Sequence, residues 1–347
     1  MHTLKVLFAL TAATALTACG GGGGADTPPA PPPPPPAPDV GTNGTLQTSV
    51  APSTYSDARR KDAFAQLNAV RLGAGAGLLA QSAILDKSAS EHANYLTLNG
   101  FNSADSAHDE VASGQGYTGS NPFSRMLADG YHYSYATEVI GDIGSTSATS
   151  DCVGDLLDTV YHAASMLSRV TDVGFGFGSG AAAGMCTIDM ASPLSGGAAL
   201  QIPPSGAIVA YPYAGSTVAH GTFHVSSESP RVSTSLLPNA TAGTPIVVGF
   251  RNQDVVAGSA VTITQFTIAT SSGTTLPAVI LGAPASGSAA AIAGTNVNAD
   301  TSLDTDFAVL VPQSPLAAGT YKVTLAATIS GGRALALGTW SFTVAAP

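Results

Sequence analysis

Apolar residues in the first half of the chain recur with the period of an amphipathic helix. Residues 64–70 and 85–96 each place apolar side chains on one helical face, and the glycine-rich stretch 73–77 lies between them as a turn. The strongest pattern is at residues 153–167, where apolar side chains fall on one stripe. The sequence therefore predicts three helices, the last of which runs unbroken over residues 153–167.

Short runs between and after these helices have the pattern of strands. Residues 136–143, 172–178 and 185–192 alternate in polarity or carry β-branched side chains, and glycines bound them. Helices mixed with short strands are typical of an α+β or layered domain. We place the end of this domain near residues 203–206.

After residue 207 the helical period disappears. Runs of alternating or β-branched residues, separated by Gly, Pro, Ser and Asn, predict a second domain at residues 207–347. This pattern is typical of an all-β sandwich of the immunoglobulin-like type. The strand-like runs are residues 244–250, 260–268, 305–311, 319–328 and 338–344.

Residues 1–18 have the composition of a secretory signal peptide, with one lysine followed by an apolar stretch too short to span a bilayer. Residues 16–19, Leu-Thr-Ala-Cys, resemble the lipobox of bacterial lipoproteins, in which the cysteine is acylated and becomes the mature N-terminus. A plain secretory cleavage site is the alternative. Because Gly20 follows Cys19, the resemblance favours an outer-membrane lipoprotein that faces the periplasm or the cell surface, anchored to the lipid membrane through Cys19.

Residues 19–55 are predicted to form a linker between this anchor and the folded part of the chain. Glycines at 20–24 provide a flexible hinge, and the proline-rich tract 28–38 favours polyproline II. The tract would span about 34 Å in that conformation. It would thus hold a domain away from a lipid surface, although a low-complexity linker with no length requirement is equally compatible.

The composition of the chain excludes some partners and predicts one crosslink. Charged residues make up only 10% of the sequence and the net charge is −10, so no basic patch exists to neutralise the phosphates of a nucleic acid. With Cys19 assigned to lipid, Cys152 and Cys186 remain as an even pair in an exported protein, which predicts a disulfide. A thiolate pair for metal or redox chemistry is the alternative, although no C-x-x-C spacing is present.

Five segments in a fixed order resemble one protein family. Together they are similar to the CAP superfamily, the cysteine-rich secretory, antigen-like and pathogenesis-related proteins, in its bacterial branch. The resemblance covers about residues 57–188 and implies an α-β-α sandwich, the SCP domain, which we place at residues 56–203. The segments are LNAVR, SASEHANYL, SAH, PFSRMLADGYHYSYATEVI and VYHAASMLSRVTDVGFGFG.

The resemblance assigns individual residues to the family's motifs. These motifs are an N-x-x-R helix, a histidine in an S-H pair, an R-x-x-x-x-G-Y stretch that leads to G-E-N-I, and a second histidine before a glycine-spaced strand. The residues that match them are Asn68, Arg71, His108, Arg125, Gly130, Tyr131, Glu138, His162 and the run 173–176.

This sequence departs from the family's pattern at several positions. Thr137 and Val139 replace the glycine and asparagine that flank the glutamate, and Leu156 replaces an expected tryptophan. Eukaryotic members carry a second glutamate on the helix before the last histidine. Here that helix offers only Asp155 and Asp158, and neither is a convincing replacement.

The resemblance implies that His108, Glu138 and His162 converge in one cleft. Two neutral imidazoles can bind Zn²⁺, with Glu138 as a third ligand or as the group that orients an imidazole. On an unbroken helix His162 would lie outside the apolar stripe and face a cleft or water rather than the main core. The alternative is a polar cavity closed by hydrogen bonds without chemistry. His92 lies on an apolar face and is interpreted as a core histidine, while His220 and other histidines without an acidic partner are interpreted as surface residues.

Motifs of other enzyme classes give no support. Residues 114–119 contain G-x-G-x-x-G, but no buried strand precedes them and no βαβ unit follows, so a dinucleotide site is rejected. No G-x-S-x-G elbow and no H-E-x-x-H helix occur in the sequence.

The predicted function is that of a CAP-domain lipoprotein of the cell envelope that binds a ligand or metal without catalysis. The partners expected besides the membrane are a small apolar ligand or a protein of the envelope or the host. One alternative is a metal-assisted hydrolase in which His108 and His162 activate water and Glu138 is the general base. Another is an adhesion protein that acts through the C-terminal β-sandwich.

Overall fold

The computed structural model describes residues 45–100, 106–142, 151–179, 185–194, 200–204, 206–250, 260–285, 291–329, 333–334 and 338–346. The predicted signal peptide and Cys19 lie outside these residues, so the lipid anchor stays a prediction. Residues 40–347 form one compact unit, and the predicted division of this unit near residue 205 also stays a prediction. Among the described helices, none is long and apolar enough to cross a lipid bilayer.

The first region is built on a four-stranded sheet with the order β1-β3-β4-β2. Strand β1 pairs with β3 in parallel, and the other neighbours are antiparallel. All three strands that the sequence pattern predicted are present in this sheet. The strands are β1 (Ala80–Gln81), β2 (Tyr133–Asp142), β3 (Asp172–Phe177) and β4 (Met185–Pro193).

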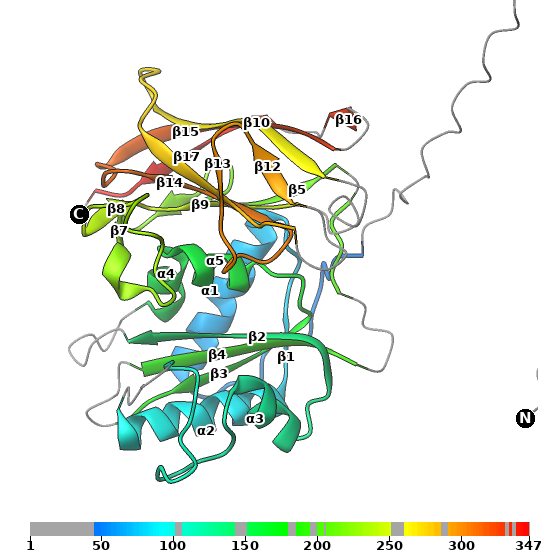
Figure 1. The fold of residues 1–347 in the computed structure, drawn as a ribbon. Helices are drawn as coiled ribbons and strands as arrows, with labels where there is room; N and C mark the ends of the chain where they lie inside the picture. The colour runs from blue at the N-terminus through cyan, green and yellow to red at the C-terminus, as the bar shows by residue number, and fades with distance from the viewer. Residues whose placement is uncertain are drawn as a thin grey trace, which may run out of the picture. The chain divides into compact units, whose positions relative to one another are not determined.

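Helices cover both faces of this sheet. Helices α2 and α3 lie on one face, while α1, α4 and α5 lie on the other (Figure 1). This arrangement confirms the predicted α-β-α sandwich. The helices are α1 (Ala58–Ala74), α2 (Ala83–Asn99), α3 (Pro122–Ala128), α4 (Cys152–Leu157) and α5 (Val160–Met166).

The glycine spacing of β3 has a packing reason. A Cβ atom added to Gly174 would lie 2.1 Å from the main chain of α2 at Leu85 and Asp86, and one on Gly176 would lie 2.0 Å from the carbonyl oxygen of Ala89. No side chain fits at those distances. The two glycines therefore allow α2 to approach the sheet closely, on the face where Glu138 and its partners lie.

The predicted continuous helix over residues 153–167 is wrong, because the structure breaks it into α4 and α5. Thr159 adopts an extended conformation with φ −115° and ψ 166° and becomes the residue before α5. Its hydroxyl donates to the carbonyl oxygen of Leu156 at 2.7 Å, which satisfies a main-chain group at the end of α4. The angular position predicted for His162 on a single helix therefore does not apply.

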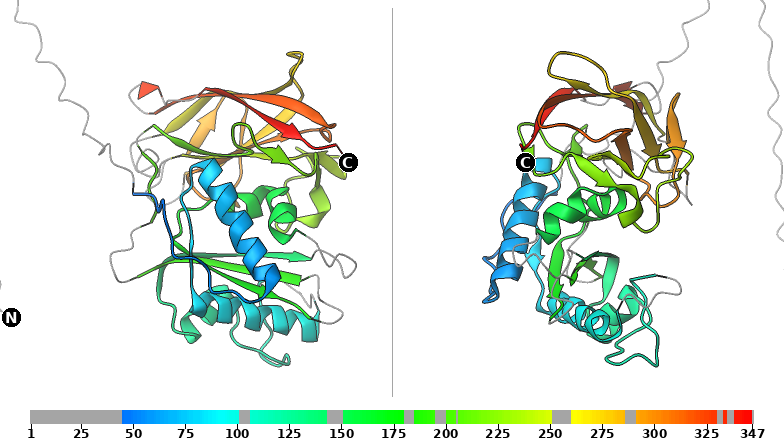
Figure 2. Two further views of the ribbon diagram at one scale, coloured as in Figure 1. Left: turned by 180° about the vertical axis from the view of Figure 1, so that it is seen from behind. Right: turned by 90° about the vertical axis from the view of Figure 1, so that its left-hand side faces the viewer.

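The second region consists of two mixed β-sheets that lie face to face and a small two-stranded sheet (Figure 2). All five predicted strands are found there, as β9, β10, β14, β15 and β17. The sheet orders are β12-β10-β15-β17-β6, with β16 beside β15, then β13-β11-β14-β9-β5, and β7-β8. The strands are β5 (Ile208–Tyr211), β6 (Thr217–Val218), β7 (Thr222–His224), β8 (Thr241–Gly243), β9 (Ile246–Phe250), β10 (Val261–Thr270), β11 (Ala278–Gly282), β12 (Ile292–Gly294), β13 (Val297–Ala299), β14 (Phe307–Pro312), β15 (Gly319–Ile329), β16 (Arg333–Ala334) and β17 (Thr339–Val344).

The alternation of side chains along β15 shows how this sandwich forms its core. Tyr321, Val323 and Leu325 are buried and face the opposite sheet, whereas Thr320 before them and Lys322 between the first two are exposed. Strand β14 is buried along its whole length, as expected for a strand covered on both sides. The region is thus a β-sandwich, while immunoglobulin-like connectivity stays a prediction.

A disulfide joins Cys152 at the start of α4 to Cys186 on β4, which confirms the predicted pairing. Both cysteines are buried, and the bond ties the α4 side of the sandwich to β4, an inner strand of the sheet.

Replacing both Cys152 and Cys186 with alanine should lower the free energy of unfolding by about 4 kcal/mol. The disulfide closes a loop of 34 residues, and without this constraint the unfolded chain gains conformational entropy. Urea unfolding followed by circular dichroism measures this loss. Wild-type protein in excess reductant is the control and should unfold at the same urea concentration as the variant. A variant as stable as the oxidised wild type would contradict the prediction.

Candidate functional site

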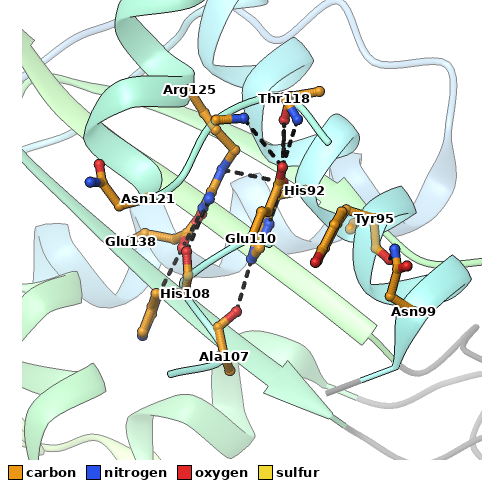
Figure 3. A network of polar contacts seen from close by, with 12 residues as sticks. His92, Tyr95, Asn99, Ala107, His108, Glu110, Thr118, Asn121, Arg125 and Glu138 are labelled. Carbon is orange, nitrogen blue, oxygen red and sulfur yellow. Dashed lines mark hydrogen bonds and ion pairs between the residues drawn. The ribbon is translucent and has the colours of Figure 1, made fainter. Parts of the chain in front are cut away.

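The centre of the site is a carboxylate that bridges a histidine and an arginine. Glu138 lies in the middle of β2, Arg125 on α3, and His108 in the segment after α2. One oxygen of Glu138, Oε1, lies 2.8 Å from His108 Nδ1 and 3.0 Å from Arg125 Nη2, and Oε2 lies 2.8 Å from the same Nη2 (Figure 3). Arg125 also donates through Nη1 to the carbonyl oxygen of His108 at 2.9 Å. The arginine therefore fixes both the histidine's main chain and its carboxylate partner.

These contacts keep Glu138 ionised. Burial by itself raises the pKa of Glu138, but the hydrogen bond from His108 and the charge of Arg125 outweigh it and hold the pKa at about 2. A carboxylate in this state only accepts hydrogen bonds, so Nδ1 of His108 carries the proton and donates it. When the His108 ring is neutral, its lone pair is therefore on Nε2.

A second buried pair, His92 and Glu110, lies beside Arg125 (Figure 3). His92 Nδ1 lies 2.9 Å from Glu110 Oε1, and its Nε2 lies 3.0 Å from the carbonyl oxygen of Ala107. Both ring nitrogens of His92 are thus engaged with groups inside the protein. The interpretation of His92 as a core histidine is confirmed, and the pair carries no free ring nitrogen for a ligand.

The glycine-rich segment 114–119, which resembled a dinucleotide motif, binds a carboxylate of the protein itself. Glu110 Oε2 accepts the main-chain N–H groups of Thr118 at 2.6 Å and of Gly119 at 3.3 Å. A Cβ on Gly119 would lie 2.8 Å from the hydroxyl of Ser124, so the close turn requires glycine. The segment therefore holds the side chain of Glu110 in place.

Asp189 is a buried acid that the sequence interpretation missed. It lies opposite Glu138 in the β2–β4 pairing and is fully buried. Neither of its carboxyl oxygens has a hydrogen-bond partner among the described residues. Burial first, and the neighbouring charge of Glu138 second, raise the pKa of Asp189 well above its usual range. A charged residue in a run that otherwise reads as a buried strand was its only signal in the sequence.

His162, the second predicted histidine, lies in the first turn of α5. Its Nδ1 is 2.9 Å from the hydroxyl oxygen of Thr159, whose own proton is donated to the carbonyl oxygen of Leu156. Thr159 must therefore accept, which places the proton of His162 on Nδ1 and the lone pair on Nε2. Burial, and next the charge of His108, lower the pKa of His162 to about 4, so the ring is neutral at pH 7.

The structure brings the three predicted residues together only in part. His108 and Glu138 touch and line a cavity of about 340 Å³ that also includes Asn121 and Phe123. His162 lines a different cavity, of about 690 Å³, although it lies close enough to His108 for the charge of that ring to affect its pKa. Among the described residues, no three His, Cys, Asp or Glu side chains are grouped in a way that would hold a metal ion.

The interpretation of His220 as a histidine without an acidic partner is wrong. Its Nδ1 lies 2.8 Å from Oδ2 of Asp158. The sequence pattern had placed Asp158 on a continuous helix. Burial raises the pKa of Asp158 to about 7 against the opposing effect of His220. Asp155, the other acid considered in place of a second glutamate, is exposed. Both aspartates line the same cavity as His162.

Residues 64–189 match the model of the Cysteine-rich secretory protein family, CAP. This part of the chain is a CAP domain. The match begins within α1 and ends within β4, and it contains His108, Glu138 and His162. The described strands of the C-terminal sandwich lie outside the match.

Comparison with solved structures gives only weak likenesses. PcoC, a copper resistance protein from Escherichia coli, is 19% identical over 39% of this chain and 95% of its own, with a TM-score of 0.22. CopC from Methylosinus trichosporium OB3b is 17% identical over 39% of this chain and 87% of its own, with a TM-score of 0.21. At these values neither protein defines a fold or a function here. A search of curated proteins gave no match.

One motif residue of the CAP domain has a clear structural role. Asn68 on α1 donates through Nδ2 to the carbonyl oxygen of Leu79 at 3.0 Å and accepts the N–H of the same residue through Oδ1 at 2.7 Å. Its side chain thus pairs with the main chain as a neighbouring strand would. This position orients the segment that leads into β1 and α2.

Proposed function

We propose that the CAP domain is a non-catalytic binding module in which Nε2 of His108 and Nε2 of His162 accept a ligand, with a divalent metal ion such as Zn²⁺ as the simplest candidate. The observation that carries the proposal is the state of the two rings. Each commits its Nδ1 proton to an acceptor inside the protein, Glu138 or Thr159, and so leaves Nε2 as the nitrogen that can accept a ligand when the ring is neutral. Histidines that bind metal are commonly held in this way.

The donor set supports weak rather than structural metal binding. Two imidazole nitrogens fit Zn²⁺, which prefers nitrogen and sulfur ligands in tetrahedral geometry. Glu138 is a poor third ligand, because His108 and Arg125 already occupy its oxygens. Water would complete the coordination. A Zn²⁺ ion at this position would supply a positive charge for an anionic ligand group.

Catalysis has less support than binding. A general base near neutral pH needs a pKa close to 7, whereas Glu138 has a pKa of about 2 and is fully engaged with Arg125 and His108. These contacts favour a role for Glu138 in orienting His108. The hydrolase alternative would need another base.

The proposal includes a location at the cell envelope, supported by the signal-like residues 1–18 and by Cys19 in its lipobox-like context. The proline-rich linker would let the module reach ligands away from the membrane surface.

Calorimetric titration of Zn²⁺ into the fragment Gly41–Pro347 tests the metal part of the proposal. We expect a Kd in the micromolar range for the wild type and loss of binding in the His108→Ala/His162→Ala variant, because two neutral nitrogens are the principal donors. His132→Ala is the matched control, since His132 is exposed on the same domain and should leave the affinity unchanged.

Two results would contradict this expectation. Equal affinity in the wild type and the double variant would show that Zn²⁺ binds elsewhere. No heat of binding in either protein would leave the two histidines as structural residues of polar cavities.

A further inference from the structure

The C-terminal region contributes a buried carboxylate to the helix that carries His162. Glu228 follows the short 3-10 helix η2 (Val225–Ser227), lies well beyond the end of the CAP match, and is only 1% exposed. Its two oxygens accept the main-chain N–H groups of Val160, Tyr161 and His162. One side chain from the second region therefore satisfies the first three N–H groups of α5.

Helix α5 has no cap of its own. Thr159 stands at the N-cap position, where a threonine hydroxyl usually accepts an N–H of the first turn, but it makes no such bond. Its hydroxyl is used by Leu156 and by the ring of His162 instead. The N–H groups of a first turn need acceptors when they are buried, and Glu228 is the acceptor that the fold supplies.

Glu228 also lies beside the ring of His162, with 3.5 Å between its Oε1 and Nδ1 of the imidazole. The main chain of His162 is held directly by this carboxylate, at 3.3 Å, and its ring is held by Thr159. The direction of Nε2 therefore depends on a contact between regions that are far apart in the sequence.

The cavity in front of His162 has walls from both regions. The CAP domain contributes residues of α4 and the start of α5, while the C-terminal region contributes residues 219–222, 316–318 and 344–345. A ligand that reaches His162 through this cavity of about 690 Å³ would contact both regions.

We infer that Glu228 is a positioning residue of the His162 site, so that the C-terminal region holds α5 and directs Nε2 of His162 for binding. The effect of Glu228 on ligand binding rests on the proposed function, whereas its role in holding α5 does not. Binding by the CAP domain then requires a residue outside that domain.

The test uses the full chain with Glu228→Ala and Glu228→Gln, and with Asp306→Asn as a matched control. Asp306 is another buried carboxylate of the C-terminal region that contacts the first region, through Arg169 Nε at 2.8 Å. Hydrogen exchange of the amides at 160–162 reports on α5, and calorimetry with Zn²⁺ alone reports on the histidine.

For Glu228→Ala we expect exchange at 160–162 to become at least about tenfold faster, because the cap is lost. We expect the Kd for Zn²⁺ to rise at least about tenfold, as is usual when a group that orients a metal-binding histidine is removed. Glu228→Gln should show smaller changes, since its carbonyl oxygen still accepts N–H groups. Asp306→Asn should change neither quantity.

Unchanged exchange in Glu228→Ala would overturn the inference whatever the zinc result. Faster exchange with an unchanged Kd would overturn the link between Glu228 and binding. If the wild type binds no Zn²⁺, the proposed metal function fails, while faster exchange in the variant would still support the positioning of His162. If Glu228→Ala does not fold, the Glu228→Gln variant decides between the same outcomes.

Discussion

Replacing Arg71 with methionine should lower the free energy of unfolding by more than about 4 kcal/mol, which is among the largest effects of a single substitution. Arg71 lies on α1 and is fully buried. Its guanidinium donates only to main-chain carbonyl oxygens, with Nε 2.9 Å from that of Gly77, and Nη1 2.7 Å from that of Met166 and 2.8 Å from that of Ser168. Nη2 donates to the carbonyl oxygen of Ala76 at 3.0 Å.

Methionine fills a similar volume but donates no hydrogen bond, so these buried carbonyl oxygens lose their partner. Each unsatisfied group costs about 1–3 kcal/mol. Burial lowers the pKa of Arg71 to about 9, so the side chain stays charged at pH 7 and its bonds are the stronger, charge-assisted kind. Urea unfolding followed by circular dichroism measures the loss.

Arg60→Met is the control for Arg71, because Arg60 lies on the same helix and its guanidinium donates to the hydroxyl of Ser90, a side chain, rather than to buried main-chain carbonyl oxygens. We expect a loss below about 1 kcal/mol there. Arg71→Lys keeps the charge and three donors, and should recover part of the stability if the methionine variant does not fold. A methionine variant within about 1 kcal/mol of the wild type would contradict the role assigned to Arg71.

The regular elements of the fold were readable from the sequence where the pattern is long and local. The alternation along β15 and the helical period of α2 follow directly from which face is buried. The glycine-spaced strand at 172–177 was also recognised, although its reason, the close approach of α2, appears only in three dimensions. Local periodicity predicts an element because every second residue of a half-buried strand, and every third to fourth residue of an amphipathic helix, faces the core.

The break between α4 and α5 could not be predicted in this way. The stripe of apolar residues over 153–167 is real, and these residues are buried in both helices. The first turn of the second helix is capped by Glu228, a contact across 66 to 68 residues of sequence. The helical period of the apolar residues carries no information about such a distant partner. In the folded protein these tertiary contacts override the local preference for one continuous helix.

The family resemblance identified His108, Glu138 and His162, but it did not give their contacts. Its motif glutamate proves to be bonded to the motif arginine, Arg125, rather than free for a ligand. A signal for this was present in the sequence. In a chain with only 10% charged residues, each charge within an apolar run is a candidate for a buried ion pair.

The sequence also left the wall of the His162 cavity undetermined. Residues 219–222 and 316–318 carry no motif, and their part in the cavity depends on how the sandwich packs against α4 and α5. Small side chains such as Ala219 and Ala317 fit many surfaces equally well. Only the folded arrangement specifies which surface they meet.

Replacing Arg125 with glutamine should cost about 3–5 kcal/mol at pH 7, because it leaves buried carboxylates without their counter-charge. Arg125 is 1% exposed, donates to both oxygens of Glu138, and has its Nε 3.8 Å from Glu110 Oε1. The substitution also removes the bond to the carbonyl oxygen of His108, so the loop that carries this histidine should loosen. Urea unfolding measured across a range of pH detects both effects.

The pH dependence separates charge from packing in this prediction. In the wild type the low pKa of Glu138 stabilises the fold above the ordinary glutamate pKa, and this contribution is lost progressively as the pH falls from that value toward about 2. Without Arg125, burial raises the pKa of Glu138, so the variant can protonate this acid at moderately low pH. The difference in unfolding free energy between wild type and variant should therefore be largest above pH 5 and should narrow toward pH 4.

Two further variants make the Arg125 prediction specific. Arg125→Gln combined with Glu138→Gln should be more stable at pH 7 than Arg125→Gln alone, because the second substitution removes the uncompensated charge. Arg231→Gln, at an exposed arginine of the C-terminal region, should change stability by less than about 0.5 kcal/mol. A deficit for Arg125→Gln that stays constant from pH 8 to pH 4 would assign its effect to lost packing, and the electrostatic role of Arg125 in holding Glu138 against His108 would then be refuted.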